Sequence, residues 1–293
     1  MAASVLVAGS ALMLTAPSSL AATPAQTSPA SSPSASADVT WAPADTAAIH
    51  PGVMMYTKGA QCTANFVFTD GSGNVYVGYA AHCAGTGGAT ETNGCDAASL
   101  PLGTPVTFNK GGSLLSEGTV VGNGTLAYSS WLTMQASGES DADTCAYNDL
   151  ALVKVDPQYV DDVNPSIPFW GGPTGINTTG TQLGDKVYTY GNSSLRAGVK
   201  VLSPHLGASL GDSGGGWSHK LYSVGPGIPG DSGSAFLDGD GNAVGVLSTL
   251  GLAPLPLSNN IGDLSHELTY AQAESGITDL ALAPGTEPFA PVL

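Results

Sequence analysis

The chain has few charged residues, and very few of these are positive. Only 10% of its 293 residues are charged, and 7 Lys and Arg stand against 23 Asp and Glu, so the net charge is −16. A surface of this kind repels nucleic acid and anionic membranes. We therefore expect no nucleic-acid or membrane partner, and the composition indicates a soluble, acidic, secreted protein.

Long helical patterns are also rare. The chain holds 40 Gly and 20 Pro, which favour short strands joined by turns, and its 42% hydrophobic residues are enough for a sizeable core. One stretch predicts a helix, with Asp263 as its N-cap and Gly276 at its end. One face of this helix collects Leu264, Leu268 and Ala271. The predicted fold class is all-β with a C-terminal helix.

The first 45 residues carry almost no charge. Residues 5–14 form an apolar run that is too short to span a membrane and is followed by small residues, so we expect a signal peptide over 1–22, although no Lys or Arg precedes the run. Residues 23–45 are rich in Ser, Ala, Thr and Pro and predict a disordered linker. The catalytic domain is expected over 46–276, with a C-terminal tail over 277–293.

The four cysteines show no C-x-x-C spacing, so a zinc site is not expected, and neither is any other metal or cofactor. In an exported protein four cysteines suggest two disulfides, with three possible pairings. Cys62 and Cys83 flank a predicted hairpin, whose ends meet in space. We expect the pairs Cys62–Cys83 and Cys95–Cys145.

Three short segments contain the candidate catalytic residues. His82 lies in Ala-Ala-His-Cys, Asp149 leads into an apolar strand, and Ser232 lies in Gly-Asp-Ser-Gly-Ser. A serine hydroxyl is a weak nucleophile that needs an imidazole as base and a carboxylate to orient the imidazole. The order His, Asp, Ser therefore predicts a nucleophilic hydrolase.

Each residue also has a simpler interpretation. His82 could be a core histidine beside a disulfide, and Asp149 a carboxylate at the edge of a strand. The rival acids lie in a polar acidic run that predicts a solvated loop; they are Glu139, Asp141 and Asp143. Asp149 is favoured because a carboxylate at a buried strand needs a partner.

A second Gly-Asp-Ser-Gly sequence contains Ser213. It is followed by three glycines, 214–216, which predict a flexible loop, whereas Ser232 is followed by a tight turn and an apolar strand. A nucleophile needs a rigid turn whose N–H groups face the developing oxyanion. We therefore favour Ser232, with the N–H groups of Gly230 and Ser232 as the oxyanion hole.

The three segments resemble the chymotrypsin-like serine peptidases, and more closely the trypsin-like secreted proteases of bacteria, over roughly residues 50–275. The resemblance implies two packed six-stranded antiparallel β-barrels with the active site between them. His82 and Asp149 would belong to the first barrel and Ser232 to the second. It also implies hydrolysis of protein or peptide substrates through an acyl-enzyme. The sequence shows no oligomer signal, so we expect a monomer.

The chain departs from this family at its activation segment, because no Ile-Val-Gly-Gly sequence precedes the first strand. Asp231, beside the predicted oxyanion hole, should be buried and should need a cation. We expect Arg196, the only arginine, or a lysine to supply it in place of a new N-terminus. The alternative is an exposed, unpaired Arg196.

The substrate-binding positions implied by the family are Pro226, Ser248, Thr249 and Leu250. None is acidic, so the sequence disfavours an Arg- or Lys-directed pocket and suggests small or apolar substrate side chains. Two rival functions remain at this stage. One is a catalytically silent homologue that only binds a partner, and the other is an esterase, whose Ser, Asp, His order this chain does not follow.

Overall fold

A computed structural model describes residues 39–88, 91–113, 115–250 and 256–291. The predicted signal peptide and most of the predicted linker lie outside these residues. From residue 39 onward the linker prediction is wrong, since Trp41 packs against the core and the Ala42 N–H donates to the Val163 carbonyl at 2.9 Å.

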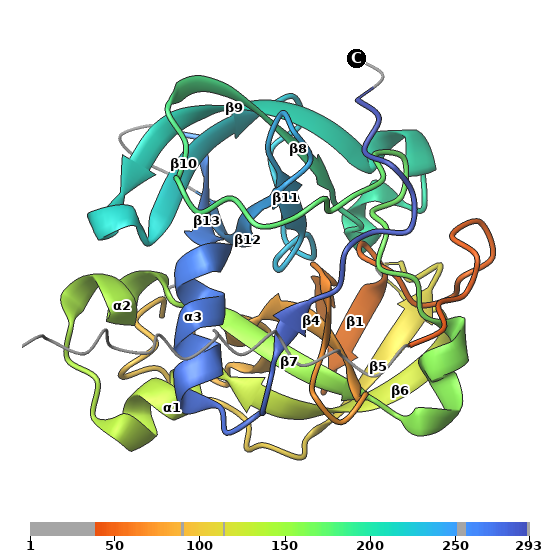
Figure 1. Ribbon diagram of the computed structural model, residues 1–293, viewed down its shortest axis with the longest axis horizontal. Helices are drawn as coiled ribbons and strands as arrows, with labels where there is room; N and C mark the ends of the chain where they lie inside the picture. The colour runs from red at the N-terminus through yellow and green to blue at the C-terminus, as the bar shows by residue number, and fades with distance from the viewer. Residues whose placement is uncertain (1–38, 89–90, 114, 251–255, 292–293) are drawn as a thin grey trace, which may run out of the picture. The chain divides into compact units, whose positions relative to one another are not determined.

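Eight antiparallel strands form the first sheet, in the order β14-β3-β4-β7-β6-β5-β1-β2 (Figure 1). Their bounds are β1 Met54–Thr57, β2 Ala60–Thr63, β3 Val67–Thr69, β4 Val75–Ala80, β5 Pro105–Lys110, β6 Thr119–Ser129, β7 Leu150–Val155 and β14 Ala281–Leu282. β7 is buried at five of its six positions, which agrees with its nearly continuous apolar sequence.

Six further strands close into a barrel in the order β10-β13-β12-β11-β8-β9. Their bounds are β8 Leu183–Tyr190, β9 Pro204–Ser213, β10 Ser218–Ser223, β11 Ala235–Leu237, β12 Ala243–Leu250 and β13 Asn259–Asp263. The all-β, two-sheet architecture is confirmed. The strand count of the first sheet differs from the predicted six, partly because the C-terminal segment adds β14 to it.

The segment predicted as a C-terminal tail packs against the fold. Ala281 pairs with Thr69 of β3, and Leu280 is buried. Further along, the Phe289 ring lies edge-on to Tyr188 of the barrel, with centroids 5.3 Å apart. The sequence suggested a tail because this short strand pairs with β3, which lies far away along the chain.

The helix expected near the C-terminus is confirmed as α3, Leu264–Glu274, and the Asp263 side chain caps it by accepting from the His266 N–H. Two short helices were not predicted: α1, Ser130–Ser137, and α2, Ala142–Tyr147. The acidic run predicted as a solvated loop is therefore partly helical, with Asp141 as the N-cap of α2. Helices of six to eight residues are too short to show a clear 3.6-residue pattern.

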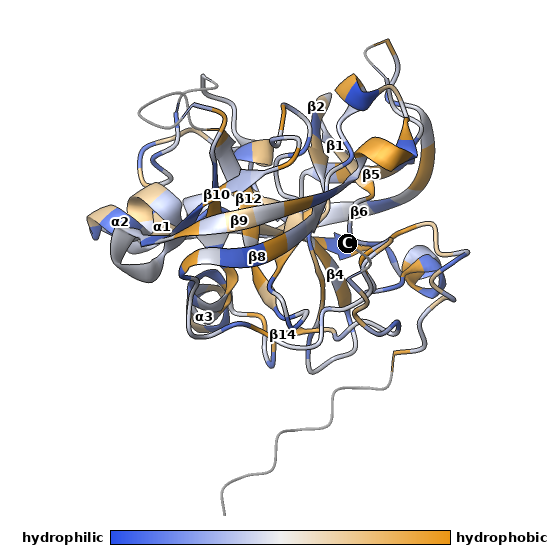
Figure 2. Ribbon diagram, turned by 90° about the horizontal axis from the view of Figure 1, so that it is seen from above, coloured by the Kyte–Doolittle hydropathy of each residue, from blue (hydrophilic) through white to orange (hydrophobic). Residues whose placement is uncertain are grey.

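The interior is divided into two clusters, and apolar residues are distributed along the strands of both sheets (Figure 2). The larger cluster fills the first sheet and extends to Leu237 and Val246 of the barrel. The smaller one lies within the barrel; its members are Val187, Leu221, Phe236, Val244, Leu247 and Ile261. The continuous larger cluster holds the first sheet against one side of the barrel.

Candidate active site

His82 and Asp149 are brought together by the pairing of β4 with β7. Ala80 is aligned with Leu150, so the turn after β4 lies beside the residue before β7. His82 sits in the 3-10 turn Ala81–Ala84. Its backbone N–H donates to Asp149 Oδ1 at 2.8 Å, and its ring Nδ1 lies 2.7 Å from Oδ2.

The Asp149 carboxylate controls the charge of the His82 ring. Burial lowers the pKa of His82, but the negative charge and hydrogen bond of Asp149 outweigh it, so the pKa ends above its usual value. Asp149 is only 4% exposed. Because Nδ1 is held by Asp149, Nε2 is the nitrogen left for a reactant, and it has no hydrogen-bond partner within the described residues.

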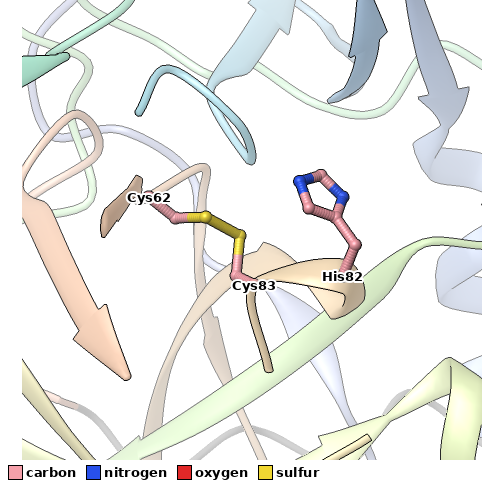
Figure 3. Close-up of side chains that lie close together, drawn as sticks. All are labelled: Cys62, His82 and Cys83. Atoms are coloured by element: carbon pink, nitrogen blue, oxygen red, sulfur yellow. A yellow bond between two sulfur atoms is a disulfide. The ribbon is translucent and has the colours of Figure 1, made fainter. Parts of the chain in front are cut away.

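Two disulfides fix the segments that carry this pair: Cys62–Cys83 and Cys95–Cys145. The first joins β2 to the turn of His82, and the imidazole projects from that turn beside the bridge (Figure 3). Ligand atoms of Cys62, Cys83 and His82 lie within 4.8 Å of one another. Both sulfurs are oxidised, so they offer no thiolate to a metal.

The turn that carries Ser232 lies between the two sheets. The Ser232 carbonyl accepts from the Thr63 N–H at 2.8 Å, and the Gly233 N–H donates to the Leu247 carbonyl at 2.7 Å. Gly233 has φ +89°, and a Cβ there would lie 2.6 Å from the Thr63 carbonyl and 2.9 Å from the Ala80 nitrogen. Only glycine allows the turn to approach β2 and β4 this closely.

These contacts gather the three predicted residues at one junction. Ala80, beside the Ser232 turn, precedes His82 by two residues, while Ser248, next to Leu247, donates to Asp149 Oδ2 at 2.7 Å. No hydrogen bond joins His82 Nε2 to Ser232 Oγ in the part of the chain that the structure describes. Nucleophile–base hydrogen bonds are often long in enzymes without substrate.

The backbone of the Ser232 turn leaves two N–H groups unused. The N–H of Asp231 donates to Ile228 and that of Gly233 to Leu247. Those of Gly230 and Ser232 have no protein acceptor among the described residues. Gly230 adopts φ +98°, a conformation that favours glycine. Two free donors in one rigid turn are the requirement of an oxyanion hole.

Asp231 is 1% exposed and forms an ion pair with Arg196. Arg196 Nη2 contacts Asp231 Oδ2. The carboxylate also accepts from the N–H groups of Ser193 at 2.9 Å and Ile228 at 3.1 Å. A buried carboxylate with a cation and two backbone donors is fully satisfied, and it anchors the turn that contains Ser232.

The rival serine, Ser213, ends β9 within the barrel. Its hydroxyl donates to the Ser218 carbonyl at 3.3 Å, and its neighbour Asp212 lies 2.6 Å from the Nδ1 of buried His219. Ser213 therefore belongs to a different polar cluster from His82. The glycines after it form the short turn Gly214–Gly216, in which none is buried and Gly215 has φ +60°.

The residues predicted to bind substrate differ in their contacts within the protein. The Ser248 hydroxyl is bound to Asp149, and Thr249 Oγ1 accepts from the Asn260 side chain at 3.0 Å. Pro226 and Leu250 remain partly or fully exposed. Sequence analysis missed Asn259, a buried residue whose Oδ1 accepts from the N–H of Gly227, next to Pro226, at 2.9 Å. The only sequence feature that could have indicated Asn259 is that two consecutive asparagines, 259 and 260, begin strand β13.

Several solved structures of proteases are similar to this chain at low sequence identity. The strand topology is that of the two-barrel chymotrypsin fold. Thermobifida fusca protease A is 17% identical, with a TM-score of 0.49, over 81% of this chain and 99% of its own. Nocardiopsis protease is 17% identical, with a TM-score of 0.46, over 80% of this chain and 98% of its own. Cellulomonas bogoriensis chymotrypsin is 16% identical, with a TM-score of 0.44, over 80% of this chain and 98% of its own.

No protein-family model matches the chain, and no curated protein is similar to it. The solved structures are too distant for an activity to be transferred from them. The chemistry must follow from the side chains at the junction of the two sheets.

Proposed function

We propose that the protein is a serine endopeptidase in which Ser232, His82 and Asp149 form the catalytic triad. The observation that carries the proposal is the buried Asp149 carboxylate, which holds both the backbone and the ring of His82 beside the Ser232 turn. Holding Nδ1 in this way leaves Nε2 to act as a base.

The reaction follows from these positions. Ser232 Oγ attacks the substrate carbonyl and its proton passes to His82 Nε2, while the N–H groups of Gly230 and Ser232 bind the oxyanion. His82 then protonates the leaving amine, which departs and leaves an acyl-enzyme. A water molecule, deprotonated by His82, hydrolyses the ester and regenerates Ser232.

The ion pair between Arg196 and Asp231 supports a site that needs no newly formed N-terminus. Arg196 supplies, from within the folded chain, the cation that the buried Asp231 requires. The turn of Ser232 is thus anchored without chain cleavage. This arrangement is consistent with the lack of an Ile-Val-Gly-Gly segment.

The substrates we infer are proteins or peptides with small or apolar side chains at the primary position. Pro226, Thr249, Leu250 and Asn259 bring no charged group to the expected pocket. The two disulfides favour an extracellular location. We further infer export by a signal peptide at 1–22 and a monomeric protein. No helix within the described residues is long and apolar enough to cross a membrane.

Hydrolysis of a fluorescently labelled denatured protein tests the proposal. The wild type should release peptides, Ser232→Ala should lose the activity, and Ser213→Ala should keep it. Loss of activity in Ser213→Ala alone would reassign the nucleophile. A folded wild type that hydrolyses no protein or peptide ester would favour the silent homologue.

A further inference from the structure

A second acidic side chain, Glu267 of α3, contacts the backbone of Asp149 in the His82–Asp149 pair. It is 0% exposed, although glutamate is seldom fully buried without a partner. Its Oε1 accepts a hydrogen bond from the backbone N–H of Asp149 at 2.9 Å. Its Oε2 has no partner among the described residues.

The backbone facing Glu267 leaves room for this carboxyl group. A Cβ at Gly262 of β13 would lie 2.3 Å from Glu267 Oε1 and 3.0 Å from the Tyr147 carbonyl. Any larger residue at 262 would displace the carboxyl from Asp149. The contact therefore depends on a glycine in one element and an acid in another.

No cation offsets Glu267 within the described residues. The titratable groups that act on the pKa of Glu267 are Asp149 and Asp263, and Glu267 in turn raises the pKa of the buried Tyr128. Burial raises the pKa of Glu267 well above its usual value and the two aspartates raise it further, although the hydrogen bond from Asp149 lowers it. Burial thus favours the neutral form of the Glu267 side chain, which can hold the Asp149 backbone without repelling the Asp149 charge.

The backbone of Asp149 is held on both sides. Its N–H donates to Glu267, and its carbonyl accepts from the Ala81 N–H at 2.7 Å. The side chain projecting from this fixed peptide reaches His82 with both oxygens. We propose that Glu267 is a positioning residue for the triad: its buried carboxyl fixes the peptide from which Asp149 orients His82. This inference rests on the proposed function.

Three variants of the full chain test it: Glu267→Gln, which keeps a neutral acceptor, Glu267→Met, which removes it, and the control Glu274→Gln on the exposed side of α3. Competent sites are first counted with a fluorophosphonate probe, so that kcat refers to folded enzyme. We expect E267Q and E274Q to match the wild type in kcat and in the pH at which activity falls. E267M should lose about 10-fold or more in kcat with KM little changed.

E267M should also move the acid limb of kcat to lower pH, because a displaced Asp149 stabilises protonated His82 less. Unchanged kcat and acid limb in E267M would overturn the inference while leaving the triad intact. If E267M does not fold, E267Q supplies the test. A pH dependence of kcat that is unchanged in E267Q supports a neutral Glu267 carboxyl, and a shift of the acid limb of kcat to lower pH contradicts it. If the wild type itself is not labelled at Ser232, the proposed function fails first.

Discussion

The hydroxyl of Ser248 and the ring of His82 share one oxygen of Asp149. Ser248 Oγ donates to Oδ2 at 2.7 Å, and His82 Nδ1 lies 2.7 Å from the same atom. Asp149 Oδ1 accepts a hydrogen bond from the backbone N–H of His82. Ser248 belongs to β12 of the barrel, so this contact connects the barrel to the first sheet at the point where the chemistry is proposed.

Replacing Ser248 by alanine should therefore weaken the triad. The variant loses a hydrogen bond to a charged, buried group, which is typically worth about 1.5–3 kcal/mol. We expect kcat/KM on a peptide substrate to fall by roughly 10-fold or more. The matched control is Ser265→Ala on α3, which should behave as the wild type. Equal activities of the two variants would show that Asp149 does not depend on Ser248.

Activity should depend on the protonation of His82. Since Asp149 raises the pKa of His82 above 6.5 and only the neutral ring acts as a base, kcat/KM should fall as pH drops through a midpoint above 6.5. Asp149→Asn removes the charge, so any residual activity should show a lower midpoint. In a known Ser-His-Asp triad the same change lowers kcat about 10⁴-fold. A wild-type midpoint clearly below 6.5 would contradict the pairing.

Arg196 should matter for both activity and stability. Arg196→Met leaves the buried Asp231 without its cation, and breaking a buried ion pair typically costs about 3–5 kcal/mol. We expect a lower unfolding midpoint in urea and a loss of kcat, because the Ser232 turn loses its anchor. Lys200→Met, an exposed change four residues away, is the control. An R196M variant with unchanged activity would remove Arg196 from the account.

The buried His219 makes stability pH-dependent. Burial lowers the pKa of His219, but its contacts with Asp263 and Asp212 outweigh this and raise it. A raised pKa in the folded state means that the stabilisation is complete below pH ~6.5 and is lost as pH rises through the folded value. His219→Gln should be less stable than the wild type at pH 6, by about 3 kcal/mol, and the difference should shrink at alkaline pH. Urea unfolding at several pH values measures this, and a constant difference would contradict a charged His219.

The sequence indicates those candidate site residues that lie in short contiguous motifs. His82, Asp149 and Ser232 each lie in a distinctive local pattern, and Asp263 was recognisable as a helix cap. The Cys62–Cys83 pair followed from a hairpin, because the two ends of a hairpin meet in space. Such features depend on neighbours along the chain.

The missed features depend on residues far apart. Ser248 contacts Asp149 across 99 positions and Glu267 does so across 118. No short sequence motif indicates either contact, and from the sequence alone Glu267 could be taken for an exposed residue of the helix. The strand β14 was missed because its pairing with β3 joins opposite ends of the chain. Only the folded backbone brings these groups together.

Labelling with a fluorophosphonate probe followed by peptide mapping identifies which serine is the nucleophile. Such a probe reacts covalently only with a serine that its surroundings have activated. We predict one modified peptide, carrying the label on Ser232, and no label in His82→Ala. A label on Ser213, or none on folded wild-type protein, would contradict the account.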